Sequence, residues 1–573
     1  MAEGIGVALL IAGSLAGLGI PWLIGRIVDL LQDAHAAGRG LDSSMLFKEA
    51  SFLVGLSVLA GLARFGMRWT MIGSSRHIER ELRDELFAKL LALDQGYFLK
   101  HSAGDLMSRA TNDLNAVRMM LGPGLMYPLN AAVTLAVAIS FMIAIDWRLT
   151  LIGLIPLPLL SLLIYLLSNR LHRGYLSIQE RFSQIVSRTQ ENLSGIRVVK
   201  AFVREEAELE RFAEAGRDYY EQNLRMVRLM ALFMPSFHLL SGGAVVLVLF
   251  FGSRAALAGE ISVGQLLALI QYLIMLSWPV MSLGWVTSVI QRGSASWGRI
   301  LEILDREPAI VSPPGAAQGP ALAGDLEIRG LSFAYDGLPV LRDIHLTVPM
   351  GGSLGLVGPT GSGKTTLLRL LPRLLDPPPG TVFLAGADVR SLPLDRLRRS
   401  IAWVGQEPLL FSESLQDNLC FARPEAPDRE RDAAARDAAI LDEIRAFPEA
   451  WQSQIGERGI NLSGGQKQRI CLARALLKGA GLIILDAPFS SVDTHTEELI
   501  LQALRARLAG CTLLLVSHRI STVMHADRII VLEDGRITES GSHAELLAAG
   551  GLYTRMVERQ SLEERLREGG LSA

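Results

Sequence analysis

One eight-residue stretch decides the fold of the C-terminal half of this chain, and it reads Gly358-Pro359-Thr360-Gly361-Ser362-Gly363-Lys364-Thr365. It matches the phosphate-binding P-loop pattern, in which glycines let backbone N–H groups curl around nucleotide phosphates at a helix N-terminus. An apolar run precedes it at 354–357, and a segment of helical composition opens at Thr366. We therefore predict a strand, a P-loop and a helix here. Lys364 would add a charge near the phosphates, and the Thr365 hydroxyl would ligate Mg²⁺.

A second apolar run, at 481–486, ends in a carboxylate, Asp486. In P-loop NTPases an aspartate at the end of such a buried strand holds the Mg²⁺ ion. Many strands end in aspartate, so this residue is informative chiefly because a P-loop lies upstream of it. Other β-rich runs alternate with helical segments in the same region, which is typical of an α/β sheet. We therefore predict an α/β P-loop NTPase domain over 325–573.

The N-terminal half has a different composition. Of the 573 residues in the chain, 50% are hydrophobic and only 20% are charged, and the net charge is −2. Soluble globular domains carry about 25% charged residues, so this chain is too apolar to be wholly soluble, and its balanced charge gives no attraction to nucleic acid. Runs long enough for a membrane-spanning helix occur at 4–25, 50–72, 119–145, 149–169, 229–253 and 261–291.

These six runs predict an all-α transmembrane domain over 1–304, followed by a linker rich in Pro and Gly over 305–324. The run at 50–72 is the weakest of the six because Arg64 and Arg68 interrupt it. Arginines in such a segment either snorkel to the interface or face a water-filled cavity.

The charge of the connections predicts the topology. The two long connections, at 73–118 and 170–228, carry eighteen Lys and Arg residues, and the short connections carry four. Loops rich in Lys and Arg stay in the cytoplasm. We therefore expect a multi-pass protein of the cytoplasmic (inner) membrane, with both termini and the nucleotide-binding domain in the cytoplasm.

The segment Leu462-Ser463-Gly464-Gly465-Gln466 lies between the P-loop and the strand that ends at Asp486. With this segment the sequence resembles the ATP-binding cassette (ABC) superfamily, whose signature it is. The resemblance implies that the Ser463 hydroxyl and the glycine N–H groups bind the γ-phosphate of an ATP molecule held by the opposite subunit. Two cassettes would then sandwich two ATP molecules head to tail.

The resemblance implies roles for four further residues. Tyr335 is similar to the aromatic residue that stacks on adenine. Gln406 is similar to the Q-loop residue that senses the attacking water and the transmembrane helices and is a ligand of Mg²⁺. Asp493 closes a segment similar to the D-loop, Ser490-Ser491-Val492-Asp493. His518 resembles the switch histidine that contacts the γ-phosphate.

The N-terminal half resembles the exporters of the same superfamily, which carry six spans and one nucleotide-binding domain per chain. Residues 104–113 and 191–202 match the two cytoplasmic extensions of these exporters, and Gly456-Glu457-Arg458-Gly459 is a further exporter trait, in which Glu457 would contact the extensions. The polar amphipathic segment that usually precedes the first span is almost absent, as expected for a truncated N-terminus or a misassigned start.

This likeness implies a half-transporter that sits in the lipid bilayer, pairs with a second half-transporter and uses ATP and Mg²⁺. The implied substrate is a small amphipathic molecule: a drug, a lipid or a peptide. A soluble DNA-repair ABC ATPase would lack the six spans, and an importer would carry its spans and its cassette on separate chains.

One family position departs from the pattern. Family members place a glutamate directly after the Mg²⁺-binding aspartate, and here that position holds Ala487. The glutamate orients and deprotonates the attacking water, and general-base help of this kind is worth roughly 10²–10⁴-fold. Because a methyl group cannot accept a proton, we predict that ATP on this P-loop is bound but hydrolysed very slowly.

Three explanations for Ala487 stay open at this point. In the first, which we favour, the chain is the subunit of a heterodimeric exporter that carries the degenerate site, and its intact signature completes the site of its partner. In the second, the chain forms a homodimeric multidrug or lipid exporter with an engineered Glu-to-Ala change that traps the ATP-bound state. In the third, another carboxylate, Asp493 or Glu407, replaces the glutamate.

Overall fold

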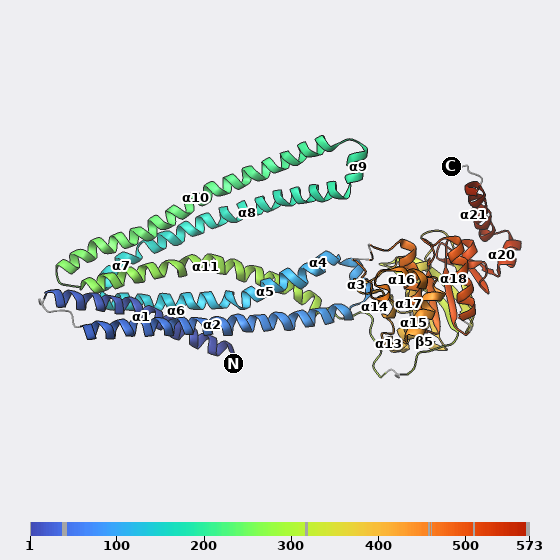
Figure 1. Cartoon of the computed structure of the whole chain (residues 1–573), viewed down its shortest axis with the longest axis horizontal. Helices are drawn as coiled ribbons and strands as arrows, with labels where there is room; N and C mark the ends of the chain where they lie inside the picture. Colours follow the sequence, from blue (N-terminus) through green and yellow to red (C-terminus); the bar gives the residue numbers. More distant parts are fainter. Residues whose placement is uncertain are drawn as a thin grey trace. The chain divides into compact units, whose positions relative to one another are not determined.

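A computed structural model of the chain describes residues 2–36, 43–315, 319–456, 459, 461–507 and 510–568. The chain divides into two compact units. The first unit comprises Met1–Leu91 and Ser102–Arg306, and the second comprises Ala92–His101 and Glu307–Ala573. The first is helical and the second is built around β-sheets (Figure 1). This order confirms the predicted fold class, an all-α membrane domain followed by an α/β domain.

The helices of the first unit cover nearly all residues of the six runs that the sequence predicts to span the membrane. Their bounds are α1 Ala2–Ala36, α2 Ser43–Ala92, α4 Ala103–Ser108, α5 Leu114–Leu121, α6 Pro123–Ile145, α7 Trp147–Leu154, α8 Pro156–Ser194, α9 Ile196–Ala201, α10 Glu205–Leu257 and α11 Val263–Leu304, with a π-helical turn, η1, at Arg109–Asp113.

Five helical segments among the described residues are long and apolar enough to cross a membrane. They run over Gly4–Ala36, Ser44–Ala92, Ala103–Ile145, Glu205–Leu257 and Val263–Leu304. The predicted span at 149–169 is helical, but it is divided between α7 and α8, and α8 begins with a proline at Pro156. The chain is therefore a multi-pass membrane protein, and the count of six spans stays a prediction.

One buried tyrosine lies at the centre of the packing between the membrane helices. Tyr272 of α11 is fully buried, donates a hydrogen bond from its hydroxyl to the backbone carbonyl of Leu18 at 2.8 Å, and stacks on Phe141 of α6. Val248 of α10 belongs to the same apolar cluster. The cluster thus joins residues of five helices, α1, α6, α7, α10 and α11.

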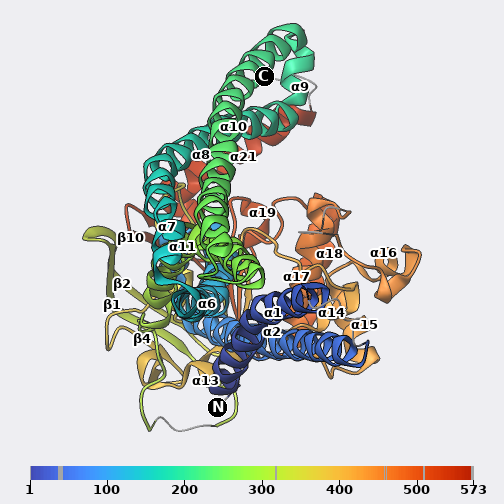
Figure 2. The ribbon, with the colours of Figure 1, turned by 90° about the vertical axis from the view of Figure 1, so that its left-hand side faces the viewer.

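Helices α8 and α10 pack side by side and are joined by the short helix α9. The end of this pair that carries α9 extends away from α1 and α2 (Figure 1, Figure 2). Several large apolar side chains on it are exposed, among them Phe182, Phe202 and Tyr220. They lie in the long polar connection at 170–228, outside the predicted spans.

An ion-pair network attaches the segment 104–113 to the end of α11. Arg109 donates to Glu302 at 2.8 Å and to Asp105 at 2.9 Å. The buried Asp113 accepts hydrogen bonds from Ser296 and Arg299 of α11. Burial disfavours the charged carboxylate, but the hydrogen bonds and the charge of Arg299 outweigh burial and hold the pKa of Asp113 below its usual value.

One short segment departs from the predicted domain boundaries. Residues 92–101, which contain α3 (Gln95–Lys100), pack with the second unit and not with the helices on either side of them in the sequence. The Asp94 carboxylate accepts from the backbone N–H of Ala309 at 3.3 Å, and Lys100 lies 3.6 Å from the carboxylate of Asp336. These polar contacts explain why the segment belongs to the second unit.

The described part of the second unit contains two sheets. The four-stranded antiparallel sheet has the order β2-β1-β4-β5 and the six-stranded sheet has the order β10-β9-β3-β8-β7-β6. All neighbours in the larger sheet are parallel except β9 and β10. The strands are β1 Leu326–Tyr335, β2 Leu338–Val348, β3 Ser353–Val357, β4 Val382–Leu384, β5 Ala387–Asp388, β6 Ile401–Val404, β7 Leu482–Asp486, β8 Thr512–Val516, β9 Arg528–Glu533 and β10 Arg536–Gly541.

Helices cover the sheet and enclose its apolar strands. They are α12 Lys364–Leu370, α13 Leu394–Arg399, α14 Leu415–Cys420, α15 Asp428–Asp437, α16 Leu441–Ala446, α17 Gly464–Lys478, α18 Thr494–Arg507, α19 Ile520–Val523, α20 His543–Ala549 and α21 Leu552–Glu568. Every residue of β7 is buried, as expected for a parallel strand that is covered on both faces. The predicted strands at 354–357 and 481–486 correspond to β3 and β7.

Breaking the ion-pair network should measurably lower the stability of the first unit. We expect Asp113→Asn to lower the free energy of unfolding of the first unit by about 1–3 kcal/mol, because it leaves Arg299 without its buried partner. The low pKa of Asp113 means that its contribution is present above pH ~4, the unfolded value, and is lost as the pH falls through the folded pKa.

Thermal unfolding of the detergent-solubilised protein measures this loss. Asp218→Asn is the matched control, because Asp218 pairs with Arg181 on an exposed surface and an exposed pair is worth at most about 1 kcal/mol. Equal stability losses in the two variants would contradict the proposed importance of the network.

Candidate nucleotide site

Four neighbouring parallel strands end at one edge of the larger sheet, and most of the predicted site residues follow these ends. The P-loop follows β3, His518 follows β8, Asp486 closes β7 and Gln406 follows β6. In open α/β sheets this carboxyl edge is where ligands bind. The topology therefore collects residues that are more than 150 positions apart in the sequence at one edge.

Glycines are required in the P-loop for steric reasons. Gly358 has φ +149°, and a Cβ atom there would lie 2.1 Å from the carbonyl oxygen of Leu532. Gly363 has φ +102°, and a Cβ atom there would lie 2.8 Å from the Leu341 side chain. Gly361, also at positive φ, is exposed together with Pro359 and Thr360. Only glycine fits these positions without strain, so the loop forms an open backbone cradle.

The Lys364 side chain folds back over this cradle. Its ammonium group donates to the backbone carbonyls of Gly358 at 2.9 Å and Pro359 at 2.7 Å, and it lies 3.3 Å from the hydroxyl of Ser362. Burial lowers the pKa of Lys364, and the negative charge of Asp486 opposes that shift. The cation is thus held at the loop by neutral acceptors.

Asp486 and Thr365 form a pair of oxygen ligands beside the cradle. The Thr365 hydroxyl donates to the Asp486 carboxylate at 3.0 Å. Burial raises the pKa of Asp486, and the Thr365 hydrogen bond together with the charges of Arg369, Lys364 and His518 opposes the rise. A carboxylate and a hydroxyl are the hard oxygen ligands that Mg²⁺ prefers, so the donor set fits the ion.

The structure brings His518 close to this group, whereas Gln406 shows no described contact with it. Partial burial of the imidazole lowers the pKa of His518, and the positive charge of Lys364 lowers it further. The negative charge of Asp486 opposes both effects. Gln406 is exposed, and none of the described hydrogen bonds joins it to Thr365 or Asp486. Its predicted role as a Mg²⁺ ligand stays a prediction.

Ala487 occupies a constrained backbone position next to Asp486. Its φ is +51°, its side chain is buried, and its N–H donates to the carbonyl of Val516 at 2.9 Å. Left-handed backbone costs a residue with a Cβ atom about 1–2 kcal/mol. The strained position therefore presents a methyl group, which neither accepts a proton nor binds water.

The sequence offers two other carboxylates, Asp493 and Glu407, in place of the missing glutamate. Asp493 accepts a hydrogen bond from the backbone N–H of Thr496 at the start of α18, at 2.9 Å. Hydrogen bonds from the backbone and the side chain of Thr496 lower the pKa of Asp493, which makes it a weaker base. Glu407 is exposed on the loop after β6.

Tyr335 lies near the nucleotide cradle at the end of β1. Its hydroxyl is 3.5 Å from the hydroxyl of Thr366, the third residue of α12, and its ring packs edge-to-face on Phe333. This places an aromatic ring beside the P-loop helix, where the family resemblance predicts the stacking residue.

The signature segment forms the N-terminus of α17. Ser463 caps the helix: its hydroxyl accepts from the N–H of Gln466 at 3.2 Å, and the Gln466 side chain accepts from the Ser463 N–H at 2.8 Å. Ser463 and Gly464 are exposed, whereas Leu462 is buried. Among the described residues, no hydrogen bond joins this segment to the P-loop of the same chain.

The signature and the D-loop pack closely. A Cβ atom on Gly465 would lie 2.7 Å from the carbonyl oxygen of Ser491, so this position needs glycine. Gln468 donates to Ser490 at 2.5 Å and accepts from the N–H of Ser491 at 2.9 Å. The two segments are therefore packed directly against each other. The exporter trait at Glu457 lies outside the described residues.

A buried glutamate that the sequence analysis missed connects the D-loop with the His518 loop. Glu497 of α18 accepts hydrogen bonds from Arg519 at 2.8 Å and from Thr522. Arg519 also donates to the carbonyl of Val492 at 3.1 Å. In the sequence an acidic residue in the first turn of a helix indicates only a favourable dipole interaction, so no pattern could have singled it out.

Comparisons with known proteins place both halves of the chain. Residues 4–280 match the ABC transporter transmembrane region family, and residues 341–490 match the ABC transporter family. The chain is 34% identical to the ATP-binding/permease protein YheI of Bacillus subtilis, over 99% of this chain and 97% of that protein. It is 36% identical to the ATP-dependent lipid A-core flippase of Syntrophus aciditrophicus, over 86% and 82%.

A solved structure agrees with these sequence matches. The structure of a bacterial Atm1-family ABC exporter with ATP bound superimposes with a TM-score of 0.79 and 27% sequence identity. The match covers 97% of this chain and 99% of the other. The likeness therefore extends over both units.

The Glu497 contacts predict a structural role that its neighbour lacks. We expect Glu497→Gln to lower the free energy of unfolding of the second unit by about 1–3 kcal/mol, because Arg519 loses its charged acceptor. The exposed Glu498 is the matched control, and Glu498→Gln should stay within about 0.5 kcal/mol of the parent chain. Thermal unfolding compares the two, and an unchanged stability of Glu497→Gln would refute the role.

Proposed function

This chain belongs to the ABC transporter family as an exporter half-transporter that carries a transmembrane region and an ATPase domain, and on that premise we propose its mode of action. Two such half-transporters pair in the cytoplasmic membrane and export an amphipathic substrate at the expense of ATP. This chain supplies a nucleotide site that binds ATP but hydrolyses it slowly. The observation that carries the proposal is Ala487, a methyl group placed beside an otherwise intact set of phosphate- and metal-binding residues.

The residues at the carboxyl edge of the sheet fit a nucleotide with its metal ion. The backbone of the P-loop and Lys364 would hold the phosphates, Thr365 and Asp486 would hold Mg²⁺, and Tyr335 would stack on the base. When bound, Mg²⁺ neutralises charge on the phosphates. The chain's own contribution is orientation, since the fixed N–H groups and the Lys364 ammonium need little rearrangement to meet an anion.

Two surfaces support pairing with another half-transporter. The exposed N-terminus of α17 presents the Ser463 hydroxyl away from any described bond to its own P-loop, as a group that acts on a partner's nucleotide would. The exposed apolar side chains near α9 would be buried against a second chain. Closure of the paired cassettes around ATP would then shift the spans between inward- and outward-facing states.

The heterodimer explains Ala487 with the fewest assumptions. An intact signature is of use to a partner even when the site on the same chain is slow. A homodimer with an engineered Glu-to-Ala change would share these contacts. The two explanations differ in the natural residue at position 487, which is alanine in the heterodimer and glutamate in the engineered homodimer. Replacement of the base by Asp493 is disfavoured, because the hydrogen bonds that cap α18 lower the pKa of its carboxyl group.

The membrane half supports a proposal for the substrate and the orientation. We place the Lys- and Arg-rich extensions, the termini and the nucleotide-binding domain in the cytoplasm. The flippase among the relatives acts on lipid A-core by its name, which supports an amphipathic substrate for this chain too. No role with nucleic acid is proposed.

Restoring the carboxylate should restore hydrolysis. We expect Ala487→Glu to raise the ATPase rate of the purified chain roughly 10²–10⁴-fold, because it supplies the missing general base. Ala487→Gln is the matched control, since it has nearly the same volume and the same backbone strain but accepts no proton. A steady-state phosphate-release assay measures both, and equal rates for the Glu and Gln variants would count against the proposal.

A second experiment tests the pairing. With the second half-transporter present, Ser463→Ala on this chain should lower the ATPase rate of the pair about 100-fold, the effect of removing one preorganised donor. Lys364→Ala on this chain should lower it much less, because the rapid site is on the partner. The heterodimer is excluded if the pure single chain hydrolyses ATP as fast as the pair.

A further inference from the structure

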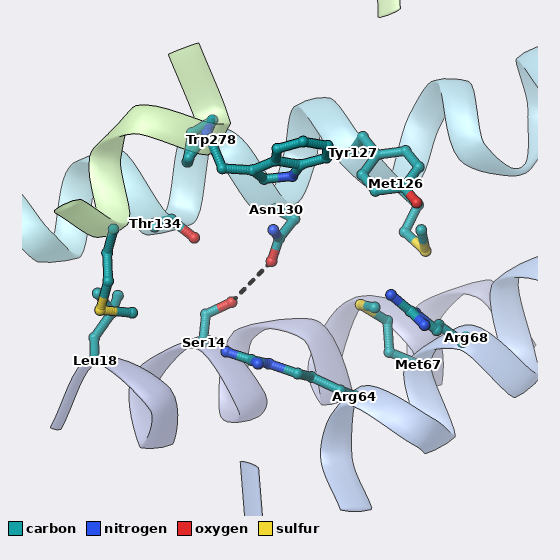
Figure 3. A pocket seen from close by; sticks show the side chains of 12 residues that line it. Ser14, Leu18, Arg64, Met67, Arg68, Met126, Tyr127, Asn130, Thr134 and Trp278 are labelled. Carbon is teal, nitrogen blue, oxygen red and sulfur yellow. Dashed lines mark hydrogen bonds between the residues drawn. The ribbon is translucent and has the colours of Figure 1, made fainter. Parts of the chain in front are cut away.

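A cavity of about 270 Å³ lies inside the first unit, between helices that are candidates for crossing the membrane. Its lining comes from α1, α2, α6 and α11 (Figure 3). The polar lining includes Ser14, Asn130 and Thr134, and the aromatic lining includes Tyr127 and Trp278. The two arginines that interrupt the predicted span at 50–72 also line it.

The charged residues that line the cavity are all basic. Arg64 and Arg68 lie one helical turn apart on α2, and both contribute to the lining, which contains no Asp or Glu. Among the described residues neither guanidinium makes an ion pair or a side-chain hydrogen bond, and both side chains are exposed. Charges in a membrane segment are costly, and those that face a cavity mark candidate pathways for a substrate or an ion.

The surrounding residues leave room for these cations and do not neutralise them. A Cβ atom on Gly17 of α1 would lie 3.0 Å from a guanidinium nitrogen of Arg64, so the glycine makes space for that group. The Ser14 hydroxyl donates a hydrogen bond to the side-chain oxygen of Asn130 at 3.3 Å. Figure 3 shows the two arginines on the α2 side of the cavity, opposite Asn130 and Met126 of α6.

We propose that this cavity is a subsite for the anionic headgroup of an amphipathic molecule, a phosphate or a carboxylate, with Arg64 and Arg68 as its ligands. Guanidinium groups bind such anions through paired N–H donors. Trp278, Met67 and Met126 supply apolar surface next to the charged groups for the adjoining part of the molecule. The inference deepens the proposed function, on which it rests, by naming the substrate class: amphipathic anions.

A binding measurement tests the subsite without requiring ATP hydrolysis. Decyl phosphate is titrated into the full-length protein in phosphatidylcholine nanodiscs, and partition into empty nanodiscs is subtracted. We expect saturable binding of decyl phosphate, none of decyltrimethylammonium, and at least a tenfold loss of affinity in the double variant Arg64→Gln/Arg68→Gln.

Two further variants separate charge from folding. Arg64→Lys/Arg68→Lys keeps both charges and should retain binding within about tenfold, with the weaker geometry of ammonium groups. Arg148→Gln removes an exposed arginine of α7 that lies against Trp147, outside the cavity, and should bind like the parent chain. Each variant is checked for a monodisperse elution profile and for retained MgATP.

Three results would overturn the inference. The first is unchanged affinity for decyl phosphate in a well-folded Arg64→Gln/Arg68→Gln variant. The second is saturable binding of decyltrimethylammonium by the parent chain. The third is displacement of decyl phosphate by inorganic phosphate at equal concentration, which would assign the cavity to water-soluble anions. If the parent chain binds decyl phosphate but the paired half-transporters show no ATP-driven transport, the proposed function is overturned and the subsite stands.

Discussion

The parallel pairing of β3, β8 and β7 is the constraint on which the nucleotide site depends. Because these three strands run in the same direction and are buried on both faces, their carboxyl ends meet at one edge of the sheet. The P-loop, the His518 loop and the end of β7 are thereby placed together. A buried carboxylate at Asp486 is tolerable there because Thr365 donates to it and because the positive charges of Arg369 and Lys364 offset its charge.

Binding and hydrolysis make different demands on this arrangement. Binding needs a preformed cradle, which the three left-handed glycines and the Lys364 hydrogen bonds provide. Hydrolysis needs in addition a group that takes a proton from water, and the strained backbone at Ala487 holds a methyl group where the family has that base. A chain of this kind can close around ATP and stay closed, so it can act as the slow half of a pair whose other half turns over.

The sequence predicted those features that depend on contiguous residues. The P-loop, the buried strand that ends at Asp486 and the apolar spans follow from local pattern, and the structure places β3, β7 and the membrane helices at the expected positions. The role of Glu497 could not be predicted, because Glu497 lies on α18 and its partner Arg519 lies in the loop after β8. The packing of 92–101 with the second unit likewise depends on tertiary contacts. Arg64 and Arg68 were visible as an interruption, but only the fold brings them opposite Asn130 in one cavity.

The central claim is that this chain retains MgATP and scarcely cleaves it. A single-turnover experiment on the unaltered chain, in which radiolabelled MgATP is bound first and its cleavage is then followed by rapid quench, tests it most directly. The account predicts near-stoichiometric binding, followed by cleavage roughly 10²–10⁴-fold slower than in the same chain with a glutamate at position 487. Rapid cleavage of the bound nucleotide by the unaltered chain, or failure to bind it, would contradict the account.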